Sequence, residues 1–255
     1  MAASANQPTL VLLHGLLGDA NDWQPVQAAL AGLPSLALDL PGHGSNQAVR
    51  VTGFEQAHRW LCGELAARGI GRYQLVGYSL GGGSPSITPA SRRLGCRPCC
   101  WRTAIPACHR QSGPPASPTM RAGPGASSRT PGDRAGRLVS AGVFADLGED
   151  ARDRQIARRL GNDGKAVAAM LRATSLGRQP DLGPWLAQSA LPVTYVSGKR
   201  DHKFHRLACL MASQHRKINH LELDGGHNLH AHQPETFARL LAEWVNQQQE
   251  EKRHD

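Results

Sequence analysis

The sequence predicts an α/β fold in which helices cover a mainly parallel sheet. Short apolar runs typical of buried strands alternate along the chain with amphipathic helical segments. Most of the strand-like runs end in loops that carry polar side chains. With 255 residues the chain is long enough for one large core, so we expect a single domain over residues 1–255.

The first third of the chain predicts three strands and one long helix. "TLVLLHG" is an apolar run that ends in His-Gly, and "SLALDLPGHGSN" is a strand that enters a Pro-Gly turn. Apolar residues at three- and four-residue spacing predict a helix over Phe54–Arg68, which ends at Gly69. "YQLVGYS" is the next predicted strand.

Regular structure is predicted again from about Gly142. "DARDRQIARRL" and "GKAVAAMLRATSLG" predict two helices joined by the turn "GND". "LPVTYVSGKRD" and "HLELDGGHN" are each a strand followed by a loop. "PETFARLLAEWVNQ" begins with Pro and predicts an amphipathic closing helix.

Residues 83–140 differ in composition from the rest of the chain. They contain nine of the 17 prolines, four of the six cysteines and nine arginines against one acidic residue, Asp133. Eight of the nine net positive charges therefore lie in this low-complexity segment, and no apolar periodicity predicts a helix or strand there. A disordered linker or a basic insert that binds nucleic acid are the open alternatives, but Trp101 alone supplies no aromatic interleaving.

Gly77-Tyr78-Ser79-Leu80-Gly81 has the Gly-x-Ser-x-Gly pattern of a nucleophile elbow. In an elbow the serine occupies a tight strand-to-helix turn, and the glycines allow neighbouring backbone to approach closely. Taken alone, the pentapeptide is equally compatible with an ordinary loop.

An acid and a histidine follow the serine in the order that an elbow enzyme needs. Asp201 in "VSGKRD" and His227 in "LDGGHN" each lie on a loop after a late strand. In this scheme His227 accepts the proton of Ser79, and Asp201 holds the imidazole in the useful tautomer. Each residue alone could be a turn carboxylate or a loop histidine, but the ordered set of three favours catalysis.

The amides of Leu16 and Leu80 are the predicted oxyanion hole. Leu16 follows the first strand in "HGL", and Leu80 follows the serine. We expect the His14 side chain only to order its loop.

The sequence predicts no metal and no cofactor. His230 and His232 lack a His-Glu-x-x-His helix, so we interpret them as loop residues. Cys96, Cys99 and neighbouring Cys108 and His109 have no second paired half at zinc-finger spacing.

The chain resembles the α/β-hydrolase superfamily and, within it, the 2-succinyl-6-hydroxy-2,4-cyclohexadiene-1-carboxylate (SHCHC) synthase family. The resemblance rests on "HGLLGDANDW", "LDLPGHGSN", "VGYSLGG", "GNDGKAVAAMLRATSLGRQPDL", "SGKRDHKF" and "GGHNLHAHQPE". It implies an α/β-hydrolase fold with a helical lid at about residues 142–190. It also implies a lyase of menaquinone (vitamin K2) biosynthesis, which removes a proton from 2-succinyl-5-enolpyruvyl-6-hydroxy-3-cyclohexene-1-carboxylate and eliminates pyruvate.

The resemblance also implies how such a carboxylate substrate is bound. Tyr78 and Arg159 fall at substrate-binding positions, and an arginine fork suits carboxylates. The alternative for Arg159 is an exposed helix charge. The family's arginine after the elbow is Gly83 here, and its arginine in the first half of the lid has no counterpart. A serine esterase of the same fold is the alternative function.

Two compensating frame shifts in the coding DNA would explain why the resemblance stops at about residue 83 and resumes near 142. In one offset frame Cys100–His109 can encode L-E-D-G-N-P-G-L-P and Met120–Gly125 can encode A-R-W-A-R, which resemble family segments. As printed, Pro85 and Pro89 would break the elbow helix, and the segment cannot form an internal parallel strand. We therefore expect the chain as printed to be poorly folded and inactive.

The sequence also indicates where the protein is located and what it binds. "MAASANQPTLVLLHG" lacks a signal-peptide pattern and no apolar run reaches the length of a membrane span, so we expect a soluble, cytoplasmic protein. A small carboxylate is the only partner predicted, with neither nucleic acid nor membrane.

Overall fold

The computed structural model describes residues 7–83, 99–100, 146–175, 178–179, 192–216 and 218–254. The segment predicted to be irregular, 83–140, therefore lies outside the described residues except for Gly83 and a two-residue strand at Cys99–Cys100. That strand is a departure from the predicted irregularity. The predicted helix breakers, Pro85 and Pro89, also lie outside the described residues. The same holds for three of the four positions considered for zinc, since only Cys99 is described.

Every strand pair in the described chain is parallel, which confirms the predicted α/β class. One sheet has the order β2-β1-β3-β4, and β5 pairs with β6. The strands are β1 (Thr9–Leu13), β2 (Ser35–Leu38), β3 (Tyr73–Gly77), β4 (Cys99–Cys100), β5 (Val193–Gly198) and β6 (Ile218–Leu223).

The structure contains each helix that the sequence predicted, together with further helices. The helices are α1 (Gln24–Ala29), α2 (Phe54–Ala67), α3 (Leu80–Gly83), α5 (Glu149–Leu160), α6 (Gly164–Thr174), α8 (His202–Gln214), α9 (Leu229–His232) and α10 (Pro234–His254), with short 3-10 turns η1 (Ala20–Trp23) and η2 (Gly44–Asn46). The sequence predicted α2, α5, α6 and α10, but it missed α1, α8 and α9. None of the helices in the described parts of the chain is long and apolar enough to cross a membrane.

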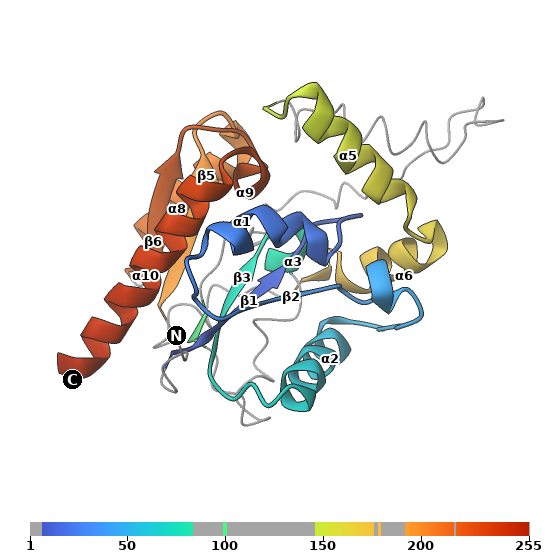
Figure 1. Ribbon diagram of the computed structural model, residues 1–255, viewed down its shortest axis with the longest axis horizontal. Helices are drawn as coiled ribbons and strands as arrows, with labels where there is room; N and C mark the ends of the chain where they lie inside the picture. Colours follow the sequence, from blue (N-terminus) through green and yellow to red (C-terminus); the bar gives the residue numbers. More distant parts are fainter. Residues whose placement is uncertain are drawn as a thin grey trace.

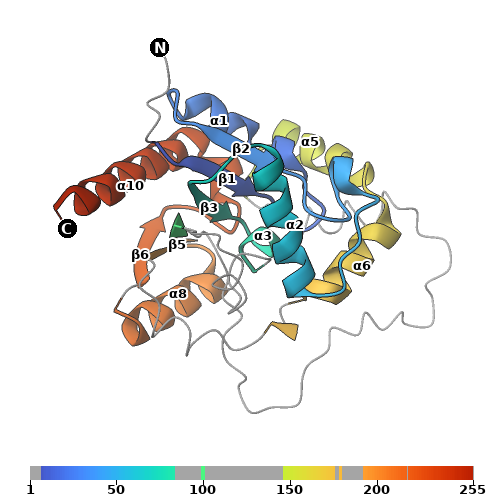
Figure 2. The ribbon, with the colours of Figure 1, turned by 90° about the horizontal axis from the view of Figure 1, so that it is seen from below.

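Alternate residues of β1 face opposite layers of helices. Leu10 and Leu12 pack in a cluster with residues of α1 and α10, whereas Val11 and Leu13 pack with residues of α2. Figure 2 shows α1 and α10 on one side of the strands and α2 and α8 on the other. Because both faces are covered, β1 is apolar at every position but its first, as parallel strands usually are.

Helices α5 and α6 lie over the loops that follow β1 and β2, in the range predicted as a lid (Figure 1). Asn162, between the two helices, ties them to both loops. Its Nδ2 donates to the Leu17 carbonyl at 2.8 Å, and its Oδ1 accepts from the Gly44 amide at 3.3 Å. Ligands of open parallel sheets bind at this carboxyl edge, so the fold places the loops of both halves where a site is expected.

β4 is the edge of the described sheet on the side of β3. Its described residues pair in parallel, Cys99 beside Gln74 and Cys100 beside Leu75. Among the described residues no ladder joins β4 to β5, so the strands form two separate sheets. An internal strand of a doubly covered sheet normally joins such halves.

Candidate active site

Ser79 lies at the sharp turn between β3 and α3. Its φ of +49° is in the left-handed region, which non-glycine residues rarely adopt. Gly81 makes the turn possible, because a Cβ there would lie 2.5 Å from the Leu13 carbonyl oxygen. A strained residue that its surroundings hold in place is typical of a functional site, and this geometry confirms the predicted elbow turn.

His227 and Asp201 meet at the carboxyl ends of β5 and β6. His227 Nδ1 donates to Asp201 Oδ2 at 2.6 Å, and both side chains are nearly buried. The other carboxylate oxygen caps α8 by accepting from the Phe204 amide at 3.4 Å. The Phe204 ring lies 4.7 Å from the imidazole, centroid to centroid. Asp201 is thus held on two sides and fixes the orientation of His227.

The two loops that carry this pair are packed together without space for side chains. A Cβ on Gly198 would collide with the carbonyl oxygens of Gly225 and Gly226. Asp146 accepts a hydrogen bond from the Gly226 amide and pairs with Arg200 at 3.2 Å. The glycines and the Asp146 carboxylate therefore set the distance between the Asp201 and His227 loops.

One pocket brings the three predicted catalytic residues together. Ser79, Asp201 and His227 all line it. Tyr78 lines it too, with its ring 5.3 Å from that of His227. The pocket also contains the buried Tyr195 hydroxyl, which has no hydrogen-bond partner among the described residues. A serine, a histidine and a carboxylate around one cavity can activate an oxygen as a nucleophile or as a base.

The loop after β1 packs directly against the elbow. A Cβ on Gly15 would lie 2.7 Å from Tyr78 Cε1 and 3.4 Å from Ser79 Cβ. The Tyr78 amide donates to the Leu13 carbonyl at 2.9 Å, and the Gly81 amide donates to the His14 carbonyl at 3.1 Å. This packing brings Leu16 and Leu80 to the same end of the strands, where their amides could bind an anion.

His14 and His43 order this loop, as expected for His14. His14 Nε2 accepts from the Leu40 amide at 2.9 Å, so Nδ1 donates to the Gly15 carbonyl at 2.7 Å. His43 Nε2 accepts from the amide of Leu17, whose φ is +60°. Burial lowers the pKa of His14, and burial with the neighbouring His14 lowers the pKa of His43 to about 4. Both imidazoles are neutral near pH 7 and serve as fixed donor-acceptor pairs.

Arg159 is buried, which excludes the alternative of an exposed helix charge. Its side chain is 1% exposed, and Nη2 lies 3.9 Å from Asp22 Oδ2. Nη1 donates to the carbonyl and side-chain oxygens of Gln155. Burial lowers the pKa of Arg159, and Asp22 opposes that shift. Arg159 is not among the residues that line the pocket, so its role as a substrate clamp stays a prediction.

The interpretation of His230 and His232 as loop residues is wrong, because both lie in the short helix α9. His230 is 2% exposed, stacks on Trp23 at 4.3 Å and lies 4.4 Å from the Tyr78 ring. It also lines the pocket. One feature of the sequence could have indicated that His230 lies at the site. It follows His227 by three residues, so the two imidazoles lie near the same end of the strands.

This fold, with a serine at a strand-to-helix turn beside a His-Asp pair, is the architecture of α/β hydrolases. The model of the alpha/beta hydrolase family matches residues 10–240. The chain therefore belongs to the alpha/beta hydrolase family.

Curated relatives narrow that assignment to one branch. A 2-succinyl-6-hydroxy-2,4-cyclohexadiene-1-carboxylate synthase of Yersinia enterocolitica is 36% identical over 264 residues, which cover 94% of this chain and 87% of that protein. The synthase of the same name from Yersinia pestis (strain Pestoides F) is 37% identical over 253 residues, 94% of this chain and 88% of that protein. The resemblance seen in the sequence motifs is confirmed.

Solved structures agree on the fold. A structure described as MenH from S. aureus superposes with a TM-score of 0.74 at 19% identity and covers 97% of both chains. A hydrolase from Pseudomonas aeruginosa PA01 has a TM-score of 0.76 at 18% identity and covers 96% of this chain and 92% of its own. At such identities the likeness concerns architecture alone.

Proposed function

We propose that this protein is an SHCHC synthase, a lyase that eliminates pyruvate from 2-succinyl-5-enolpyruvyl-6-hydroxy-3-cyclohexene-1-carboxylate in menaquinone biosynthesis. The observation that carries the proposal is the combination of 36–37% identity to synthases of that name with a strained serine beside a His-Asp pair. The proposal includes a cytoplasmic location, which suits the reduced thiol of Cys209.

In this proposal Ser79 is the base that removes a proton from carbon. His227 accepts the serine proton at Nε2 because its Nδ1 is already bound to Asp201. The Asp201 carboxylate stabilises the imidazolium that forms. The alkoxide then takes the substrate C–H proton, the C–O bond to the enolpyruvyl group breaks with its electron pair on oxygen, and the enolate takes the proton held on His227 and leaves as pyruvate. No acyl-enzyme is required, and the amides of Leu16 and Leu80 stabilise the negative charge that develops.

Tyr78 and Arg159 are the proposed contacts to the substrate carboxylates. Tyr78 lines the pocket beside Ser79. Burial raises the pKa of the Tyr78 hydroxyl, so it remains a hydrogen-bond donor at neutral pH. A guanidinium attracts carboxylates, and Arg159 is the arginine that we assign to them.

The test is pyruvate release from the cyclohexene substrate, compared with hydrolysis of a short-chain nitrophenyl ester. The chain as printed and a version whose 84–140 segment is restored to the offset frame are both assayed, because we propose that the printed segment impairs activity. Ser79→Ala and Asp201→Asn should each lower turnover by roughly 10²–10⁴-fold, while Ser213→Ala on the exposed face of α8 should not. Ester cleavage without pyruvate release would favour the esterase, and no turnover of either substrate by either version would contradict both.

A further inference from the structure

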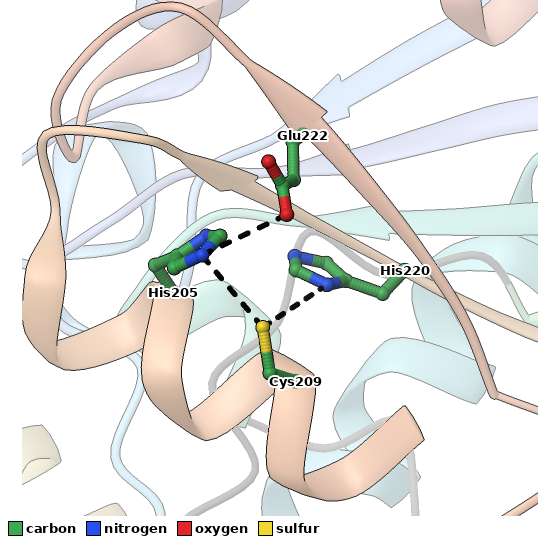
Figure 3. Close-up of side chains that lie close together, drawn as sticks. All are labelled: His205, Cys209, His220 and Glu222. Carbon is green, nitrogen blue, oxygen red and sulfur yellow. Dashed lines mark hydrogen bonds and ion pairs between the residues drawn. The ribbon is translucent and has the colours of Figure 1, made fainter. Parts of the chain in front are cut away.

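A second cluster of reactive side chains lies on α8 and β6, apart from the three residues proposed for catalysis. His205 and Cys209 are one turn apart on α8, and His220 and Glu222 point to the same side of β6. Figure 3 shows the four side chains directed at one another. One ligand atom from each lies within 4.8 Å of all the others. Of the described residues, these alone form such a group of three or more.

The separations are compatible with a shared cation. Cys209 Sγ lies 3.7 Å from His205 Nε2 and 3.7 Å from His220 Nδ1, and His205 Nε2 lies 3.7 Å from Glu222 Oε1. A nitrogen and an oxygen at that distance are too far apart for a hydrogen bond. Ligands at zinc bond lengths of ~2.1 Å and ~2.3 Å in a tetrahedron are about 3.3–3.6 Å apart.

Ser197 orients both imidazoles for this purpose. Its Oγ lies 3.2 Å from His205 Nδ1 and 2.8 Å from His220 Nε2, which are the two ring nitrogens turned away from the cluster. When the serine oxygen accepts from both, the opposite nitrogens, His205 Nε2 and His220 Nδ1, present their lone pairs toward Cys209 and Glu222. Protein metal sites commonly fix their histidine tautomers through such outer hydrogen bonds.

We propose that His205, Cys209, His220 and Glu222 form a tetrahedral Zn²⁺ site that fastens α8 to the edge of the β5-β6 sheet. One thiolate, two imidazoles and one carboxylate are the ligand types that zinc favours. Four protein ligands leave no open position, so the ion is structural. It would also stabilise the start of α8, where the His205 amide donates to the Asp201 carbonyl at 2.9 Å.

Sequence analysis predicted no metal because these ligands have no recognised spacing. The intervals are three residues, ten residues and one residue, and the ligands belong to a helix and a strand that the fold brings together. All four and Ser197 lie between residues 197 and 222, so the site does not depend on the reading frame of 83–140.

The test is zinc binding by the full-length chain, made both as printed and with residues 84–140 restored to the offset frame, after removal of metal with a chelator. Competition with a chromogenic chelator gives affinity and stoichiometry, and Co²⁺ substitution reports thiolate ligation by its charge-transfer absorption. Cys209→Ser and His220→Ala are the site variants. Cys62→Ser is the matched control, since Cys62 also follows a histidine, His58, by four residues on a helix, with Sγ to Nε2 at 3.4 Å.

We expect one Zn²⁺ per chain in the wild type and in Cys62→Ser, and at least tenfold weaker binding in both site variants. The cobalt-thiolate band and a zinc-induced rise in Tm should be present in the wild type and absent in Cys209→Ser. Absence of stoichiometric binding by the wild type, or equal affinity in Cys209→Ser, would overturn the proposal. Both readouts are independent of turnover, so a failure here leaves the proposed synthase activity unaffected, and the reverse also holds.

Discussion

His230 is a buried histidine whose protonation depends on whether the chain is folded. Its imidazole is enclosed between Trp23 and Tyr78, and the Arg159 charge is close enough to disfavour protonation. Burial first, and then the charges of Arg159 and His227, lower the pKa of His230 to about 3. The imidazole therefore stays neutral wherever the protein is folded near neutral pH.

We predict that His230 makes the protein sensitive to acid. Below pH 6.5 the unfolded chain protonates this histidine while the folded chain does not, until the pH approaches 3. Stability due to the neutral form is thus complete above pH 6.5 and falls by about 1.4 kcal/mol per pH unit below it. In His230→Gln the slope of unfolding free energy against pH should decrease by that amount, as measured by urea melts at pH 4–7.

His232→Gln is the control for that experiment, because His232 lies on the same helix but is only half-buried. Identical slopes in His230→Gln and the wild type would show that His230 is not the group responsible.

At the level of residues, the sequence predicted the placement of those that chain order brings to one edge of the strands. Ser79, Asp201 and His227 line one pocket as predicted, because each follows a strand and parallel strands end at one edge. Residues whose role depends on packing between elements were missed. Asp22 is buried against Arg158 and Arg159, 136 or more residues away, and no local pattern indicates such a contact.

Helices and strands were predictable from the sequence where apolar residues recur at a regular spacing within them. β1, β3 and α2 have strong apolar periods and were found within about two residues. α8 was missed because "HKFHRLACLMASQ" begins inside the loop predicted for Asp201, and the residue that caps the helix is Asp201 itself. The Asp201 carboxylate both caps α8 and accepts a hydrogen bond from His227. The sequence pattern does not show that one residue makes both contacts.

Substitution by alanine should change the free energy of unfolding in opposite directions at two glycines, one in α3 and one in α2. Gly81 in α3 faces the backbone of β1, where a Cβ would lie 2.5 Å from the Leu13 oxygen, and backbone cannot move aside. Gly63, in the interior of α2, has open space where a Cβ would lie, with no atom within 4 Å. We predict that Gly81→Ala destabilises by about 1–3 kcal/mol and Gly63→Ala stabilises by about 0.5–1 kcal/mol.

Chemical denaturation of the two variants beside the wild type measures both effects. A stable Gly81→Ala protein would mean that the elbow is not packed against β1 as described. If Gly63→Ala also loses stability, its position on α2 is not open to solvent.

At the scale of the whole molecule, the described strands form two sheets, and the site uses residues that follow strands of both. Residues of both halves build the site, with Ser79 after β3 and the His227–Asp201 pair after β6 and β5. α10 packs on α1, and its apolar residues share a cluster with β1, β3 and β5, so helix packing links the halves on one face. Among the described strands, β4 pairs with β3 alone.

We predict that the reading frame of the gene between codons 79 and 145 decides whether this protein works. An added or missing base near codon 83, offset by another near codon 140, would restore a strand beside β3 and the missing lid arginine. The restored chain should then melt cooperatively and release pyruvate, because an internal strand would join the two sheets and support α3. Resequencing that stretch and comparing thermal melts of the printed and restored chains provide the measurement. A cooperative melt and full turnover by purified protein of the printed mass would contradict the frame-shift hypothesis.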